Sequence, residues 1–164
     1  MKILACILSL FLLTGCWNNQ ELDQSALVHG IGLDKSEDSI ILSMEIIKPN
    51  DSGGDGLNSG ESIIIQKEAE TLIEGGRESI REIKRRPYFD HNRLWIISDE
   101  LAKDDFIRYL DISRRDQMFR LNSYLFITEE DPVNILSTPT LYDNLSSSEI
   151  VSALEQTKYI SGYT

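Results

Sequence analysis

The residues best suited to chemistry in this sequence are Leu13, Thr14, Gly15 and Cys16, which end an apolar run at the amino terminus. The Cys16 thiol is nucleophilic enough to form a thioether, and the small residues before it suit the groove of a peptidase. The apolar run Ile3–Leu13 has eleven residues. As a helix it would rise about 16 Å, roughly half of a hydrocarbon core of about 30 Å. This is the length of a signal-peptide core, so we predict a secretion signal that is processed at Cys16.

The segment from Leu13 to Cys16 resembles the lipobox of bacterial lipoproteins. In such proteins the Cys thiol receives a diacylglycerol group and the chain is cut just before that Cys. The sequence would then divide into a lipoprotein signal peptide, residues 1–15, and a mature chain, residues 16–164. The two acyl chains of an S-diacylglycerol on Cys16 suffice for stable membrane anchoring, and N-acylation of the new amino terminus stays open. The alternatives are an ordinary signal peptide with an incidental Cys, or an apolar core segment that begins at Met1.

Beyond the amino terminus the sequence offers few groups for catalysis or metal binding. Both cysteines, Cys6 and Cys16, lie within the first sixteen residues, so the body of the chain holds no disulfide, Cys₄ zinc site or thiol redox pair. His29 and His91 lack metal-motif spacing, and we interpret them as a satisfied histidine of the core or sheet edge and as a turn residue. The segment Gly30–Gly32 lacks the third glycine and the following helix of a dinucleotide-binding loop. We predict no catalytic residues, no cofactor and no metal.

The charge of the chain is acidic and unevenly distributed. Sixteen Lys and Arg residues against 27 Asp and Glu residues give a formal net charge of −11. This excess argues against nucleic-acid binding, which needs clustered cations. Residues 77–120 differ from the rest of the chain in carrying a net positive charge, with 11 basic and nine acidic residues. The cations of Lys84–Arg86 and Arg114–Arg115 would suit an anionic partner or lipid headgroups, although we favour pairing with acidic groups of the same domain.

Hydrophobic patterning predicts five strands. Only five polar residues, 34–38, separate the first two strands, which favours an antiparallel hairpin. The fourth strand is apolar on both faces, so we expect it to lie centrally in the sheet with both faces covered. The predicted strands cover residues 26–33, 40–47, 61–67, 93–98 and 121–128.

Helical spacing follows between and after these strands. We predict a helix over residues 69–86 that ends at Pro87, with Gly75 and Gly76 implying close packing against a neighbour or a break. A second helix is predicted over residues 99–112. Two later helices open with cap signals. These signals are Asp131-Pro132 for residues 131–136 and the capping box Ser146-x-x-Glu149 for residues 146–157.

The order of elements, β-β-β-α-β-α-β-α-α, indicates an α+β fold with a mixed sheet of about five strands flanked by helices. Residues 50–60 contain four glycines and almost nothing to bury, so we predict an exposed loop there.

Three segments carry a family likeness. The first segment includes Gly15-Cys16-Trp17-Asn18, Glu21-Leu22 and Gly30-Ile31-Gly32-Leu33-Asp34. The second includes Tyr88-Phe89-Asp90-His91 and Trp95-Ile96-Ile97-Ser98. The third, which matches more loosely, includes Arg115-Asp116 and Leu121–Leu136. Together they resemble the Ger(x)C lipoproteins, the C-subunit family of spore nutrient germinant receptors. The family usually has Asp in place of Asn18 and a Ser-Arg pair where this chain has Lys84–Pro87.

The resemblance implies a membrane-anchored lipoprotein subunit of a germinant receptor that works by docking and is not an enzyme. It would sit on the outer face of the cytoplasmic membrane, at the inner membrane of the spore, with two integral-membrane receptor subunits as partners. The germinant, and whether this subunit contacts it, stay open. Family members are longer and look like three α/β-type domains in series, so residues 16–164 would be the first of them, truncated at the carboxy terminus.

Two other functions are compatible with an extracytoplasmic lipoprotein. One is a substrate-binding or envelope-assembly lipoprotein unrelated to germination. The other is a tethered hydrolase, which requires a catalytic constellation that the sequence does not contain. Neighbouring genes for two polytopic membrane proteins would favour the receptor subunit.

Overall fold

The computed structural model describes residues 25–47, 62–104, 106–115, 119 and 122–161. It begins with the predicted antiparallel hairpin of β1 (Ser25–Lys35) and β2 (Ile40–Ile47), which confirms that part of the sequence analysis. The Ser36 N–H donates to the Ser39 carbonyl at 3.0 Å and closes the turn between the two strands. The predicted loop over residues 50–60 lies outside the described residues.

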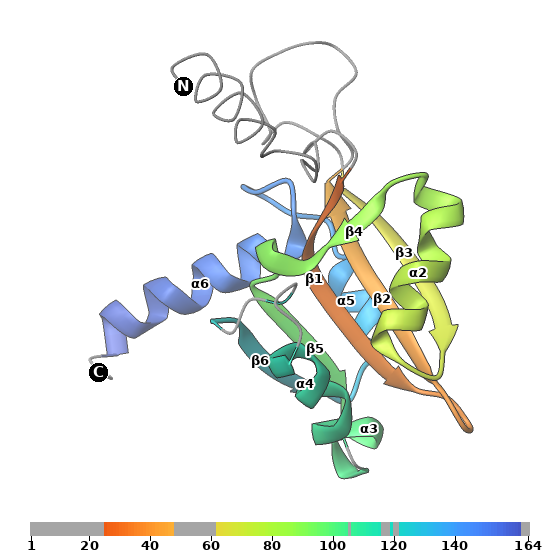
Figure 1. The fold of residues 1–164 in the computed structure, drawn as a ribbon. Coiled ribbons are helices and arrows are strands. Elements are labelled where there is room, and N and C mark those ends of the chain that lie inside the picture. The colour runs from red at the N-terminus through yellow and green to blue at the C-terminus, as the bar shows by residue number, and fades with distance from the viewer. Residues whose placement is uncertain (1–24, 48–61, 105, 116–118, 120–121, 162–164) are drawn as a thin grey trace, which may run out of the picture.

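The strands form one mixed sheet of six strands in the order β3-β2-β1-β5-β6, with β4 pairing the start of β1 (Figure 1). β2 is antiparallel to β1 and β3, whereas β5 is parallel to β1 and β6. This arrangement confirms the predicted α+β class. The remaining strands are β3 (Ser62–Ala69), β4 (Arg86–Tyr88), β5 (Leu94–Ser98) and β6 (Tyr124–Thr128).

Helices cover both faces of the sheet, as Figure 1 shows. Helices α2, α3 and α4 lie on one face, where Trp95 and Ile97 join the larger apolar core. Helix α5 and the first turns of α6 lie on the other face, where Leu94 and Ile96 join a second core, and α6 then runs away from the sheet. All five residues of β5 are buried between β1 and β6, so the prediction of a central strand is confirmed. The helices are α2 (Leu72–Ile83), α3 (Asp99–Lys103), α4 (Phe106–Arg115), α5 (Pro132–Leu136) and α6 (Ser146–Ser161).

The predicted helix over residues 69–86 is shorter at both ends. Ala69 belongs to β3, and the Thr71 hydroxyl caps α2 by accepting a hydrogen bond from the Glu74 N–H at 3.2 Å. The helix ends before Pro87, because Lys84 adopts the left-handed conformation (φ 58°) and its N–H donates to the Ile80 carbonyl. The chain then enters β4.

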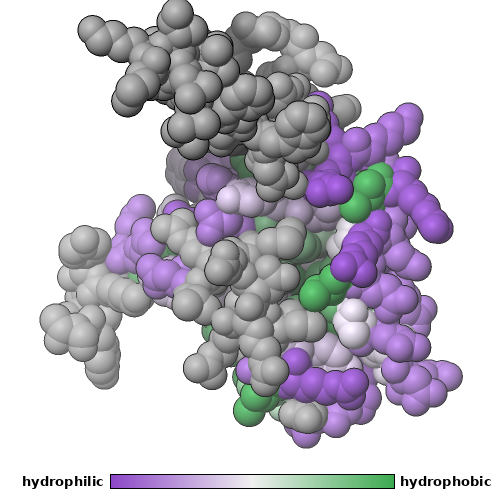
Figure 2. Space-filling view, viewed as in Figure 1, coloured by the Kyte–Doolittle hydropathy of each residue, from purple (hydrophilic) through white to green (hydrophobic). Residues whose placement is uncertain are grey.

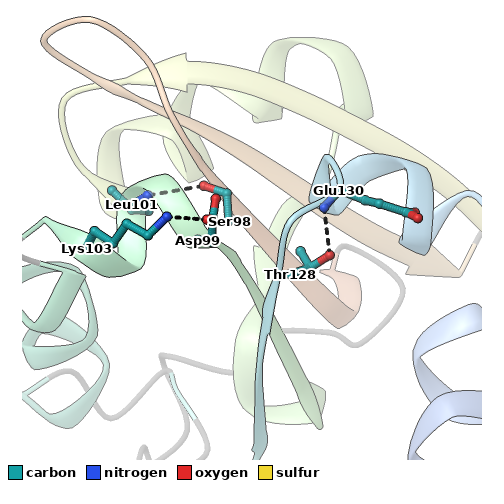
Figure 3. A network of polar contacts seen from close by, with 6 residues as sticks. All are labelled: Ser98, Asp99, Leu101, Lys103, Thr128 and Glu130. Atoms are coloured by element: carbon teal, nitrogen blue, oxygen red, sulfur yellow. Dashed lines mark hydrogen bonds and ion pairs between the residues drawn. The ribbon is translucent and has the colours of Figure 1, made fainter.

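The predicted helix over residues 99–112 is two helices. The Ser98 hydroxyl caps α3 by accepting from the Leu101 N–H, and an ion pair between Lys103 and Asp99 lies beside it (Figure 3). The extended backbone of Asp104 then ends α3. In the same figure the Thr128 hydroxyl accepts from the Glu130 N–H just beyond β6. The Ser98 hydroxyl therefore caps α3, whereas the Thr128 hydroxyl stabilises the turn that follows β6.

Both predicted later helices are present, and Asp131 and Pro132 occupy the N-cap and first turn of α5, but the predicted side-chain cap hydrogen bonds are not made. Asp131 precedes α5 but makes no side-chain cap hydrogen bond. The residues of the predicted capping box bond to other partners. The Ser146 hydroxyl donates to the Thr138 carbonyl, and the Glu149 carboxylate accepts from the Leu141 and Tyr142 N–H groups. Both side chains thus hold the chain that leads into α6.

Candidate docking site between helix α2 and the Tyr88–His91 turn

A hollow of about 370 Å³ lies between α2 and the segment formed by β4 and the short 3₁₀ helix η2 (Phe89–His91). Its walls combine apolar side chains with two guanidinium groups. Figure 2 shows strongly hydrophilic side chains over α2 and β4, with apolar surface between them. The lining residues are Ile73, Gly76, Arg77, Ile80, Arg86, Pro87, Phe89 and Phe119.

Aromatic packing fixes the floor of this hollow. The buried Phe89 ring stacks on Phe119 with ring centroids 4.7 Å apart, and the ring centroid of Trp95 lies 5.9 Å from that of Phe119. A Cβ at Gly76 would lie only 3.3 Å from the Phe89 ring. The absence of a side chain at Gly76 therefore lets α2 approach the turn closely, which supports the packing explanation for the glycine pair.

Arg77 and Arg86 stand exposed at the rim, and neither makes an ion pair within the described part of the chain. The predicted pairing of the basic residues with acidic groups of the same domain is therefore not observed for these two. An apolar floor beside two unpaired cations suits a group with an apolar body and an anionic tip. The side chains of Arg114 and Arg115 lie outside the described residues.

A buried amide, which the sequence analysis did not single out, holds the Tyr88–His91 turn against the sheet. Asn92 is 1% exposed. Oriented to satisfy its neighbours, its amide donates to the carbonyls of His29 (3.1 Å) and Leu94 (2.9 Å) and accepts from the Trp95 indole N–H (2.9 Å). The Ser123 hydroxyl donates to the Asn92 carbonyl at 2.7 Å. Asn92 thus ties the turn to β1, β5 and the segment that leads into β6.

The two histidines lie close together beside this turn. Their ring centroids are 5.9 Å apart. The prediction of a satisfied His29 is wrong for one atom, because the buried Nε2 has no hydrogen-bond partner in the described structure. Burial, followed by the charges of His91 and Arg93, lowers the pKa of His29 to about 4. The described residues contain no group of three or more potential metal ligands.

We expect His29 to make the protein less stable as the pH falls. The unfolded chain binds a proton near the ordinary pKa of 6.5, whereas the folded chain does so only near 4, so acid favours unfolding across this window. At roughly 1.4 kcal/mol for each pKa unit, the expected loss between pH 7 and pH 4.5 is about 2 kcal/mol. Urea unfolding of the native protein and of His29→Gln at both pH values measures it. An equal loss in the variant would contradict this assignment.

A second buried group holds α6 on the sheet and was also missed by the sequence analysis. Glu45 of β2 is 0% exposed, and its two carboxylate oxygens accept hydrogen bonds from the Ser146 and Ser147 N–H groups at 2.7 and 3.0 Å. Burial raises the pKa of the Glu45 carboxyl, and these hydrogen bonds oppose that shift. The carboxylate therefore caps the amino terminus of α6 from inside the sheet.

Gly30 and Gly32 allow this approach. A Cβ at Gly30 would lie 2.8 Å from Leu136 and 2.9 Å from Ser147, and one at Gly32 would lie 2.9 Å from Pro132. Both glycines are in β1, where they make room for α5 and α6. Their role is packing, which agrees with the weak dinucleotide signal of this segment.

The predicted lipobox, Leu13, Thr14, Gly15 and Cys16, lies outside the described residues. The first described residue, Ser25, opens β1 beside β4, where it pairs with Arg86. The anchor therefore stays a prediction, and the chain that follows it enters the fold next to the rim of the hollow. Among the described residues, no helix has the length and apolar character needed to cross a membrane.

Comparison with known proteins places the chain in a family. Residues 18–164 match the sequence profile of the spore germination protein N-terminal domain. The chain is 30% identical to spore germination protein KC of Bacillus subtilis (strain 168) over 161 residues, covering 93% of this chain and 39% of that protein. It is 32% identical to spore germination protein A3 of the same organism over 133 residues, covering 78% of this chain and 35% of that protein.

The chain thus spans less than two fifths of the length of these relatives. No solved structure matches it at a comparable level of significance. Together with the sequence likeness described above, the profile match shows that the chain belongs to the Ger(x)C family of spore germination proteins and corresponds to their N-terminal portion.

Proposed function

We propose that this chain is a lipid-anchored subunit of a spore nutrient germinant receptor and acts by docking to two integral-membrane subunits. Membership of a germination family favours this function over an envelope lipoprotein unrelated to germination. The structural observation that carries the docking role is the hollow between α2 and β4, with its apolar floor and with Arg77 and Arg86, which make no ion pair to any described residue. Such a surface is typical of a recognition site and needs no catalytic group.

Confinement by a lipid anchor makes docking of this kind effective. A domain tethered to the outer face of the membrane that becomes the spore's inner membrane meets integral partners at a high effective concentration, so modest contacts suffice. Because the two acyl chains on Cys16 supply the membrane affinity, the folded domain is free to use its surface for recognition.

Replacing Cys16 with alanine should move the protein out of the membrane fraction, because the thioether can no longer form. The measurement is detergent phase partitioning of cell extracts, with Cys6→Ala as the matched control, since that cysteine would leave with the signal peptide. We expect near-complete loss of the protein from the detergent phase for Cys16→Ala and no change for the control. Unchanged partitioning of Cys16→Ala would contradict the anchor.

Deletion of the gene in the spore-forming host tests the germination role. We expect loss of the response to one class of nutrients, with growth and other envelope functions intact. Restoration by the wild-type gene but not by the Cys16→Ala gene would tie the response to the anchored protein. Normal germination of the deletion strain on every nutrient would count against the receptor function.

A further inference from the structure

Cations gather at the end of the domain where β1 begins. Residues 77–86 contain five basic and two acidic residues. They form the second half of α2, the left-handed turn at Lys84 and the start of β4. We call this segment the basic end; its cations are Arg77, Arg81, Lys84, Arg85 and Arg86.

The charge of the basic end is not neutralised by the rest of the described structure. One of its two carboxylates, Glu82, is held at 2.6 Å by Lys67 of β3. Ion pairs elsewhere between described residues join Lys35 to Asp104, Arg93 to Glu155 and Lys103 to Asp99. None of them involves a cation of the basic end, although the whole chain has a net charge of −11.

The opposite end of β1 is acidic. The turn over residues 34–38 contains three carboxylates and one lysine. Because β5 runs parallel to β1, the acidic α3, which follows β5, lies toward the same end, and Lys35 is paired there with Asp104. The eleven residues of β1 separate the two ends by about 36 Å, several Debye lengths at physiological salt. The domain is thus electrically polarised along β1.

The basic end is also the end nearest to the proposed anchor. Ser25, Ala26 and Leu27 of β1 pair with Arg86, Pro87 and Tyr88 of β4. Ser25 follows Cys16 by nine residues, which span at most about 32 Å. Arg86 lies one strand spacing of about 5 Å from Ser25. The backbone of Arg86 is therefore within roughly 37 Å of Cys16, whatever path the intervening residues take.

We propose that Arg81, Lys84 and Arg85 of the basic end bind the phosphate groups of anionic phospholipids and so orient the domain with its hollow, rimmed by Arg77 and Arg86, at the membrane surface. This inference rests on the lipid anchor proposed above. These three cations are spread over the end of α2 and the turn that leads into β4, which suits a layer of phosphates better than one carboxylate of a protein partner. Since the acyl chains already retain the protein, the basic end controls orientation and not retention.

The test uses the full chain, lipidated by a bacterial host and reconstituted into vesicles. The mature chain has no cysteine except Cys16, so Glu78→Cys on α2 and Glu37→Cys in the acidic turn each introduce a single site for a fluorescent label. One set of vesicles contains phosphatidylcholine alone, and the other contains equal parts of phosphatidylcholine and phosphatidylglycerol. Quenching by a nitroxide on the lipid headgroup reports how close each label lies to the membrane.

We expect the label at residue 78 to be quenched at least twofold more strongly in the anionic vesicles, with no such gain at residue 37. High salt should remove the difference, because it screens exposed charges. The combined substitutions Arg81→Gln, Lys84→Gln and Arg85→Gln, which leave the lining of the hollow intact, should also remove it, while the exposed Arg108→Gln on α4 should not.

The outcomes separate this inference from the anchor. Flotation of the vesicles shows whether the chain is membrane-bound. If the chain floats with both vesicle types but its label is quenched equally in both, the proposed orientation is wrong and the lipid anchor is still supported. Failure to float with either type overturns both. Equal quenching combined with a photo-crosslink from residue 78 to a polytopic protein in spore membranes would reassign the basic end to an acidic protein partner and overturn the lipid contact.

Discussion

Replacing Glu45 with alanine should lower the free energy of unfolding by about 3 kcal/mol, because two buried N–H groups lose their acceptor. The Ser146 and Ser147 N–H groups point at the Glu45 carboxylate from the first turn of α6, in a region without solvent access. The variant also removes the cost of burying a charge, which offsets part of the loss. The result should be a helix α6 that no longer docks firmly on β1 and β5.

Urea denaturation measures the overall loss, and hydrogen exchange at Ser146 and Ser147 shows where it occurs. Glu45→Gln keeps one acceptor oxygen and should lose only about half as much stability. Glu68→Ala is the matched control, since this exposed carboxylate accepts hydrogen bonds from the hydroxyls of Ser36 and Ser39 at the surface. A Glu45→Ala loss no larger than that of Glu68→Ala would show that the carboxylate does not hold α6.

Asn92→Ala should cost about 2–3 kcal/mol, because three hydrogen bonds of a buried amide are lost together. The freed groups are the Trp95 indole N–H and the carbonyls of His29 and Leu94. Because Trp95 packs beside Phe119, and Phe119 stacks on Phe89, we also expect the floor of the hollow to loosen. The effect therefore reaches the proposed docking site as well as the stability of the sheet.

Near-ultraviolet circular dichroism reports the packing of Trp95, and urea denaturation gives the stability. Asn122→Ala serves as the control, because that asparagine is exposed just before β6. We expect the aromatic signal to fall for Asn92→Ala and to stay constant for Asn122→Ala. An unchanged aromatic signal in Asn92→Ala would mean that this amide does not organise the turn.

The sheet and its helical layers could be predicted from periodicity because local pattern and burial agree there. The strand at Leu94–Ser98 is apolar on both faces, and only a central strand with helices on either side can bury it. The hairpin was equally clear, since two β-type runs flank a short polar turn. In these elements the secondary-structure preference of each residue agrees with the preferences of the neighbouring residues.

The element ends and polar contacts could not be predicted, because partners far away in sequence decide them. Ser146 and Glu149 have the spacing of a capping box, yet they bond to the chain that precedes α6, and Glu45 of β2 satisfies the helix N–H groups instead. Lys84 ends α2 in a left-handed conformation that its residue type does not favour. The pairing of β4 with β1 follows directly after that turn.

The hollow itself was only partly visible in the sequence. Arg86 of its basic rim belongs to a cluster of cations in the sequence, and Phe89 belongs to the family-like turn, but Phe119 lies thirty residues further along the chain. Only the tertiary fold brings Phe89 and Phe119 into a stack at 4.7 Å under Gly76. Conversely, the lipobox is a prediction from the sequence, because the described residues begin at Ser25.

The most direct test of the docking role is affinity purification of the tagged chain from detergent-solubilised spore membranes, with the bound proteins identified by mass spectrometry. Ile80→Lys places a third cation in the hollow beside Arg77 and Arg86, and Leu141→Lys adds the same charge at a residue that is 83% exposed and outside the hollow. We expect two polytopic membrane proteins with the wild-type chain and with Leu141→Lys, and their loss with Ile80→Lys at an unchanged unfolding midpoint. Recovery of no polytopic protein with the anchored wild-type chain would contradict the proposed function.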